Sequence, residues 1–307
     1  MDYIIGMDGG GTSTILRVTD LTGAELSFVS GGASNVYANT KEQVTDTLKD
    51  LIARGVQEAG VQDGRCAALC LGVAGISNSN ADTWLPGTLS ALTGCEEDKI
   101  VLVGDFATAL AGGTDNAPGL AVIAGTGSVC FGRGPDGRFE RAGGWGHIIG
   151  DEGSAYHMAV TALNLTMKVF DGRSDNKILA RLICEKLGAT APRDIVDYVN
   201  PAKFNKTEIA RLAPLVDAAA DAGDMDALTI LDCSADALVD LCVAVAEKLS
   251  LEGKFVIATT GGVINKDPYV RPRFIERIKK HFPLAHITFP LKDSAWGAVY
   301  LAQEKLK

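Results

Sequence analysis

The feature that most constrains this fold is a short pattern that occurs twice: an apolar strand, a glycine-rich turn, a second strand and a hairpin return. The first copy spans residues 3–30 and turns at Asp8-Gly9-Gly10-Gly11-Thr12. The second spans residues 120–142 and turns at Gly125-Thr126-Gly127-Ser128. The copies are offset by roughly 115 residues, far beyond the ~20–50 residues of a solenoid repeat. Two related domains are therefore expected, although chance likeness is the alternative because hairpin turns reuse Gly, Asp and Pro.

Hydrophobic spacing predicts the elements, and their order is that of an α/β protein. Expected strands are 3–7, 14–19, 25–30, 67–73, 100–103, 120–123, 129–132, 139–142, 255–259 and 286–289. Expected helices are 41–59, 81–92, 106–112, 152–170, 175–187, 206–222, 226–249, 269–281 and 294–305. Without a low-complexity linker between the halves, we expect a ligand cleft where they meet.

Composition narrows the class of protein. The 307 residues suffice for two cores, and 47% hydrophobic residues indicate a globular chain. A net charge of −9 disfavours nucleic acid as a partner. No signal peptide or membrane span is expected. Seven cysteines without a C-x-x-C pair indicate reduced thiols, so a cytoplasmic protein with no membrane partner is predicted.

Three glycine-rich turns follow apolar strands, the third being Gly261-Gly262. Glycine lets the backbone approach a ligand, and successive N–H groups form an anion-binding nest. A single such turn fits a tight hairpin equally well. The chain lacks G-x-x-x-x-G-K-[ST], a complete dinucleotide fingerprint, H-R-D and D-F-G. Three turns together nevertheless favour a phosphate ligand.

Two aspartates end strands beside these turns. Asp8 either organises Mg²⁺ against ATP phosphates or stabilises its turn. Asp105 either acts as a general base toward a hydroxyl or caps the helix that follows. The residues alone leave these alternatives open.

The densest stretch is residues 143–155, in which glycines surround Trp145, His147, Asp151 and Glu152. Asp151 or Ser154 is expected to cap the next helix. The same groups suit a hydroxyl-rich ligand. For Trp145 a core position is the favoured alternative, because large aromatic residues are usually packing residues.

In these motifs the sequence resembles the N-acetylglucosamine kinase branch of the BadF/BadG/BcrA/BcrD ATPase family, within the actin–Hsp70–hexokinase superfamily. The resemblance spans nearly the whole chain. It rests on these segments: Asp8–Thr12, Ser34-Asn35, Gly104-Asp105, Gly125–Ser128, Gly143–His147, Gly150–Ala155 and Thr260–Gly262.

The resemblance implies a two-domain ribonuclease H-like (actin/hexokinase-like) α/β fold with a nucleotide cleft between the domains. The expected domains are 1–115, joined by the closing helix within 294–307, and 116–293, which carries a helical insertion. It also favours a homodimer, because dimers are common among relatives.

The resemblance further implies the site residues of an ATP- and Mg²⁺-dependent amino-sugar kinase, in which Asp105 is the general base and Asp8 organises Mg²⁺ through water. The expected phosphate and adenosine contacts are Gly10, Gly11, Thr12, Thr126, Gly127, Gly261 and Gly262. The expected sugar contacts are Asn35, Asp105, Trp145, Gly146 and Asp151.

The implied substrate is N-acetylglucosamine, phosphorylated at its 6-hydroxyl. Two departures leave glucosamine and N-acetylmuramate open: Ala142 replaces a cysteine found beside the sugar in the animal enzyme, and Val36-Tyr37 follows Asn35 in place of an aromatic pair. From other classes, an ATP-driven activator of a 2-hydroxyacyl-CoA dehydratase and a sugar-sensing protein without catalysis are the alternatives.

Overall fold

The structure is a computed structural model that describes residues 1–76, 79–200 and 205–307. The chain divides into two compact units. Unit 1 comprises Met1–Pro118 and Pro290–Lys307, and unit 2 comprises Gly119–Phe289. We propose that they correspond to the two domains expected above.

Unit 1 is built on a five-stranded mixed sheet in the order β3-β2-β1-β4-β5. Its strands are β1 (Tyr3–Gly9), β2 (Thr14–Asp20), β3 (Glu25–Gly31), β4 (Cys66–Val73) and β5 (Ile100–Gly104). The first three form an antiparallel meander, and β1, β4 and β5 run parallel. β1 and β4 are buried along almost their whole length, as expected for central strands covered on both faces.

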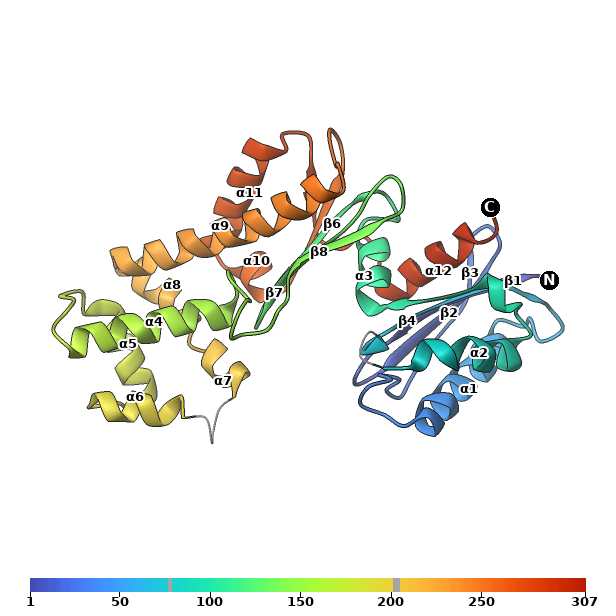
Figure 1. Ribbon diagram of the computed structural model, residues 1–307, viewed down its shortest axis with the longest axis horizontal. Helices are drawn as coiled ribbons and strands as arrows, with labels where there is room; N and C mark the ends of the chain where they lie inside the picture. The colour runs from blue at the N-terminus through green and yellow to red at the C-terminus, as the bar shows by residue number, and fades with distance from the viewer. Residues whose placement is uncertain (77–78, 201–204) are drawn as a thin grey trace. The chain divides into compact units, whose positions relative to one another are not determined.

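The helices of unit 1 cover both faces of its sheet. They are α1 (Lys41–Glu58), the 3₁₀ turns η2 (Ala81–Thr83) and η3 (Glu97–Lys99), α2 (Leu85–Thr93), α3 (Asp105–Gly113) and α12 (Ser294–Glu304). Figure 1 shows α1 and α2 on one face and α3 and α12 on the other. Val44, Leu48 and Leu51 recur at helical spacing on α1, so one apolar face packs on the sheet.

Glycines let α12 pack closely against α3 and β1. A Cβ added to Gly297 would lie 1.9 Å from the carbonyl oxygen of Thr108 and 2.5 Å from the backbone nitrogen of Gly112. A Cβ on Gly6 of β1 would lie 2.6 Å from the carbonyl oxygen of Ala295. Larger residues therefore have no room there, and the last helix is held against the first strand.

Unit 2 repeats the topology of unit 1, with the sheet order β10-β9-β6-β7-β8. Its strands are β6 (Gly119–Ala124), β7 (Ser128–Arg133), β8 (Phe139–Gly143), β9 (Val256–Thr260) and β10 (His286–Thr288). Again three strands form an antiparallel meander, and β6, β9 and β10 run parallel.

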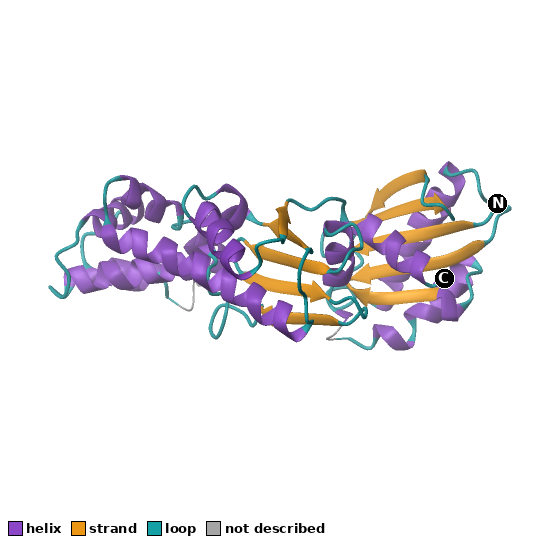
Figure 2. Ribbon diagram, turned by 90° about the horizontal axis from the view of Figure 1, so that it is seen from above, coloured by secondary structure: helices purple, strands orange, loops and turns teal. Residues whose placement is uncertain are grey.

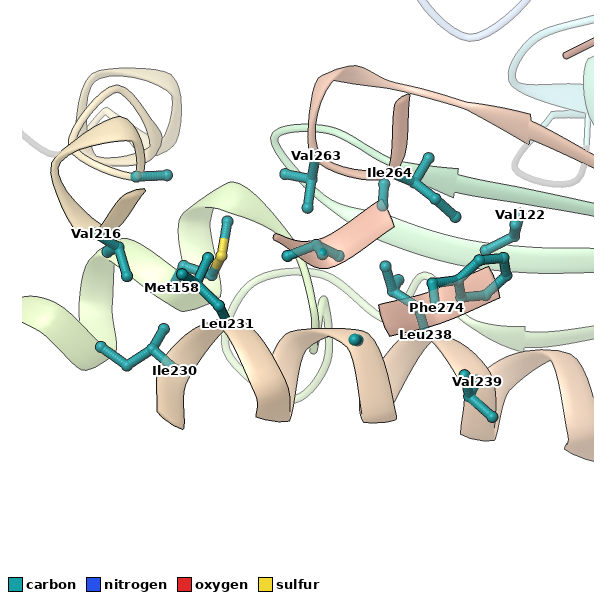
Figure 3. Close-up of a cluster of buried hydrophobic side chains, with 14 of the residues drawn as sticks. Val122, Met158, Val216, Ile230, Leu231, Leu238, Val239, Val263, Ile264 and Phe274 are labelled. Carbon is teal, nitrogen blue, oxygen red and sulfur yellow. The ribbon is translucent and has the colours of Figure 1, made fainter. Parts of the chain in front are cut away.

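A large helical segment lies between β8 and β9, in the strand-free part of unit 2 in Figure 2. The helices of unit 2 are α4 (Ala155–Phe170), α5 (Ile178–Leu187), α6 (Pro192–Tyr198), α7 (Lys206–Ala210), α8 (Pro214–Asp221), α9 (Met225–Lys248), α10 (Gly262–Lys266) and α11 (Val270–His281). Their apolar faces form one core with the sheet, and Figure 3 shows Val122, Leu238 and Phe274 within it. Among the described residues, no helix has both the length and the apolar character that a bilayer crossing requires.

The expected strands and helices are present, with three differences. The helix expected over 206–222 is two helices, because Pro214 has no N–H to donate and begins α8. The helix expected over 81–92 begins as a 3₁₀ turn and becomes α-helical only at Leu85. The short helices α6 and α10 were not expected, since five to seven residues carry too little periodic signal.

Replacing Gly297 by alanine is expected to destabilise the protein by about 1–3 kcal/mol or more, because the added methyl group overpacks the α12–α3 contact. The matched control is Gly87→Ala in α2, where the nearest atom to an added Cβ lies 3.6 Å away. That variant gains helix propensity and should be neutral or slightly stabilised. Urea denaturation of both variants checks the prediction, which equal effects would contradict.

Candidate functional site

Parallel pairing places the two strand-ending aspartates of unit 1 at one edge of its sheet. Gly9 of β1 pairs with Val73 of β4, and Val73 pairs with Gly104 of β5. The carboxyl ends of three parallel strands are therefore level, and such an edge is where open α/β sheets bind ligands. Asp8 and Asp105 both lie there. Asp105 is the first residue of α3 and Gly104 is its N-cap, so the alternative of a capping role for Asp105 is wrong.

Asp8 and Asp105 interact electrostatically. Burial and, as the next cause, the negative charge of Asp105 together raise the pKa of Asp8 from 3.8 to about 6. The Thr108 hydroxyl lies 3.4 Å from Asp8 Oδ1 and opposes the shift, as does Ser294. Asp105 is exposed, so its carboxylate is accessible to a ligand.

This pair of carboxylates fits Mg²⁺. The ion prefers oxygen ligands and is usually held by one or two carboxylates together with waters and substrate phosphates. Among the described residues there is no cluster of three His, Cys, Asp or Glu side chains arranged to hold a metal. The pKa of Asp8 is raised first by burial and then by a second carboxylate, so a cation bound here would relieve the repulsion.

The glycine turn of unit 1 is a tight connection whose outer part is exposed. The Gly10 N–H donates to the carbonyl oxygen of Ser13 at 2.9 Å and closes the turn, whereas Gly11 and Thr12 are exposed. The carbonyl oxygen of Gly10 accepts N–H groups from Ser34 and Asn35, both at 3.2 Å. The turn thus fixes the Ser34-Asn35 loop beside the strand ends.

Asn35 lies next to the end of β4. Its Oδ1 accepts N–H groups from Tyr37 at 2.9 Å and Ala38 at 3.0 Å. Gly75 has a φ of +84°, and a Cβ there would lie 2.8 Å from Asn35 Oδ1. The structure therefore brings Asn35 to the same edge of unit 1 as Asp8 and Asp105.

In unit 2 the second glycine turn encloses a buried carboxylate. Asp151 Oδ1 accepts the Ser128 N–H at 3.1 Å, and its Oδ2 accepts from Lys206 Nζ at 2.6 Å. Asp151 is buried and has a φ of +64°, uncommon for a residue other than glycine. The expected helix cap is Ser154, which accepts the His157 N–H at the start of α4.

A cavity of about 510 Å³ opens beside this turn, within unit 2. Its lining combines apolar side chains with a few polar groups, as is typical of small-molecule sites. The lining residues are Gly125, Thr126, Ala155, Met158, Thr207, Ala210, Arg211, Ala213, Pro214, Asp217, Gly262, Val263, Lys266 and Asp267. Three of them come from the sequence-predicted turns.

The third glycine turn closes one side of the cavity. Gly261 has a φ of +108°, and a Cβ there would lie 2.2 Å from the carbonyl oxygen of Ala124. Only glycine fits, because β6 and β9 run parallel and end side by side. Gly262 then begins α10 and lines the cavity.

The residues around Trp145 form an exposed loop. Gly144 and Gly146 have positive φ values, and the Trp145 side chain is 61% exposed. The Arg141 guanidinium lies 4.1 Å from the centroid of the Trp145 indole ring. The core position favoured for Trp145 from the sequence is therefore wrong, since residues with left-handed backbone hold this side chain at the surface.

Sequence reasoning missed Lys206, Asp217 and Asp267. Each lies in a segment that reads as ordinary helix or loop, and their partners are distant in sequence: Lys206 and Asp151 are 55 positions apart. The sequence signal for the two acidic residues was weak, because Asp217 lies within a helical pattern and Asp267 lies between two helices.

The two aspartates in the cavity wall influence each other. Asp267 Oδ1 accepts N–H groups from Tyr269 and Val270, both at 2.8 Å, and so fixes the start of α11. Burial raises the pKa of Asp217 from 3.8 to about 7, with the charge of Asp267 as the next cause. Burial and the neighbouring charge thus both favour the protonated form of Asp217.

The raised pKa of Asp217 predicts a pH-dependent stability. A carboxyl group whose folded-state pKa exceeds its unfolded value contributes stability below pH 3.8, and this is lost as the pH rises through about 7. Asp217→Asn should therefore raise the thermal midpoint relative to the parent more at pH 8 than at pH 5. Asp240→Asn, at an exposed position on α9, is the control and should show no such difference. A constant difference across this pH range would contradict the prediction.

Comparisons with known proteins place this geometry in a family. The chain is 38% identical over 306 residues to the N-acetylmuramic acid/N-acetylglucosamine kinase of Clostridium acetobutylicum, with 99% of each chain covered. It resembles the crystal structure of a protein from Chromobacterium violaceum proposed to be an N-acetylglucosamine kinase, with a TM-score of 0.65, 29% identity and 98% of each chain covered.

The ROK hexokinase of Thermus thermophilus shares the fold, with a TM-score of 0.59 at 18% identity and 99% coverage of each chain. The α/β fold expected from the sequence, with two five-stranded mixed sheets of the hexokinase type, is thus confirmed. The model of the BadF/BadG/BcrA/BcrD ATPase family matches residues 5–302, and the chain belongs to this family.

Proposed function

We propose that the protein is an ATP-dependent amino-sugar kinase that transfers the γ-phosphoryl group of ATP to the 6-hydroxyl of N-acetylglucosamine, with N-acetylmuramate as a second acceptor. The observation that carries the proposal is the Asp8–Asp105 pair at the glycine-turn edge of unit 1. It occurs in a chain that is 38% identical over 306 residues to an N-acetylmuramic acid/N-acetylglucosamine kinase.

The nucleotide is proposed to bind with its adenosine in the cavity of unit 2, near Gly261 and Gly262. Each unit is proposed to offer phosphate contacts at its own glycine turn: Thr126 and Gly127 in unit 2, and Gly10, Gly11 and Thr12 in unit 1. The Gly10 N–H closes its own turn, so the N–H groups of Gly11 and Thr12 and the Thr12 hydroxyl are the donors that suit a phosphate oxygen.

Asp105 is proposed to be the general base. Its exposed carboxylate would accept the proton of the 6-hydroxyl while that oxygen bonds to the γ-phosphorus and the bond to the bridging oxygen breaks, releasing ADP. Asn35, Trp145, Gly146 and Asp151 are proposed to contact the sugar. Trp145 suits this role because its indole ring is exposed, and sugars commonly pack on such surfaces through their apolar faces.

Asp8 is proposed to hold Mg²⁺, directly or through water. Asp105 interacts electrostatically with Asp8, so its negative charge would also be stabilised by the ion. When bound, the ion neutralises negative charge on the phosphates. We also propose that the enzyme acts in the cytoplasm, where ATP is available and its cysteines stay reduced. A homodimer stays a prediction.

The substrate proposal is tested by measuring ADP formation with ATP, Mg²⁺ and one of four sugars: N-acetylglucosamine, N-acetylmuramate, glucosamine or glucose. We expect the two N-acetylated sugars to give the highest kcat/KM. A preference for glucosamine would show that the enzyme does not recognise the N-acetyl group. No stimulation by any of the four sugars would contradict the amino-sugar kinase proposal.

Asp105→Asn should lower kcat by about 10²–10⁴-fold, because the side chain can no longer accept the hydroxyl proton. Binding of the sugar and of ATP, measured by calorimetry, should persist. Asp98→Asn, an exposed aspartate elsewhere in unit 1, is the control and should keep the parent rate. Near-normal turnover of Asp105→Asn would remove the assignment of the base.

A further inference from the structure

We propose that Lys206 binds a phosphate group of the nucleotide. In the absence of nucleotide the Lys206 ammonium group pairs with the Asp151 carboxylate, and the phosphate replaces that carboxylate as its partner. This inference rests on the proposed function, because it takes the ligand to be a nucleotide and Gly125–Ser128 to be a phosphate-binding turn.

In the structure, the Asp151 carboxylate accepts from two kinds of donor. The Ser128 N–H of the glycine turn lies 3.1 Å from Oδ1, and Lys206 Nζ lies 2.6 Å from Oδ2. A backbone N–H at a glycine turn together with an ammonium group is also the donor set that recognises phosphate oxygens. The turn therefore already binds a carboxylate where an anionic ligand fits.

Lys206 lies directly against the backbone of this turn. A Cβ added to Gly127 would lie 2.9 Å from Lys206 Nζ and 2.7 Å from Asp151 Oδ1. The absence of a side chain at Gly127 thus gives the ammonium group its place. A phosphate oxygen that reaches the N–H groups of the turn would meet Lys206 at the same point.

The position of α7 relative to the cavity supports the same reading. Lys206 is the first residue of α7, which is capped by the Asn205 side chain. The next residue, Thr207, lines the 510 Å³ cavity together with Thr126 of the turn. Phosphates attached to a nucleoside in this cavity would lie close to the turn and to Lys206.

Charge and accessibility allow the exchange. The Lys206 side chain is 29% exposed, so an incoming anion can reach it, whereas the Asp151 side chain is 5% exposed. The chain has a net charge of −9, so a nucleotide phosphate needs local cations. Among the described residues, the cavity lining itself contains two cations: Arg211, which is paired with Glu208, and Lys266 on α10.

The backbone conformation of Asp151 allows the competing charge to be removed by substitution with asparagine. Its φ of +64° is left-handed, a conformation that asparagine tolerates better than most residues. Asp151→Asn can therefore keep the backbone and the acceptor for Ser128 while removing the negative charge that holds Lys206.

The test is calorimetric titration of adenosine, ADP and ATP into the full-length protein in the absence of sugar. Lys206→Met should weaken ADP or ATP binding about tenfold or more, and leave adenosine binding unchanged, because only the phosphates lose a charge-assisted partner. Lys206→Arg should retain most of the affinity. Asp151→Asn should bind ADP or ATP several-fold more tightly than the parent, again with unchanged adenosine binding.

Lys280→Met is the matched control, because Lys280 also forms a 2.7 Å ion pair, with Glu276, but on the exposed surface of α11. It should bind all three ligands like the parent. Equal loss of adenosine and ATP affinity in Lys206→Met, at an unchanged thermal midpoint, would overturn the proposal, as would unchanged ATP and ADP affinity. If Lys206→Met does not fold, unchanged ATP and ADP affinity in Asp151→Asn overturns it.

These titrations are independent of the sugar. Failure of every sugar to stimulate ADP formation would reject the proposed kinase activity and leave the phosphate-selective binding by Lys206 intact. Conversely, sugar-dependent turnover with no phosphate-selective effect at Lys206 would reject this inference alone.

Discussion

Parallel strand pairing is the constraint on which the rest of the structure depends. In unit 1 the pairing of β1 with β4 and of β4 with β5 places three strand ends level, and in unit 2 the pairing of β6 with β9 does the same for two. Every glycine turn singled out in the sequence follows one of these ends. A shift of the register by one residue would reverse the faces of the strand and separate Asp8 from Asp105.

Close backbone approach is the second condition, and glycine provides it at each point. Gly6 and Gly297 allow the last helix to pack on the first strand, so that a segment from the end of the chain completes unit 1. In unit 2, Gly127 allows Asp151 to approach the backbone of its turn, and Gly261 allows the ends of β6 and β9 to lie close together. The glycines that fix the fold and the glycines proposed to face a ligand thus share one physical reason.

Much of the fold was predictable, because long amphipathic helices and buried strands carry a strong periodic signal. Shorter or interrupted elements were not: α10 has only five residues, and Pro214 divides one expected helix into two. For the site, the aspartates at the strand ends were predictable from their position beside glycine turns. The exposure of Trp145 was not predictable, because large aromatic side chains are usually buried. The left-handed glycines on either side of it hold this side chain at the surface.

The sequence by itself determined the repeated strand–turn–strand units, because an apolar strand followed by glycines is a local pattern, and with them the family resemblance. Only the tertiary structure decided what each turn encloses. The Asp8-Gly9-Gly10-Gly11-Thr12 turn closes its own hairpin and supports the loop of Asn35, whereas the Gly125–Ser128 turn surrounds the carboxylate of Asp151 and the ammonium group of Lys206. That difference depends on residues far apart in the chain, whose contacts follow from packing and not from local spacing.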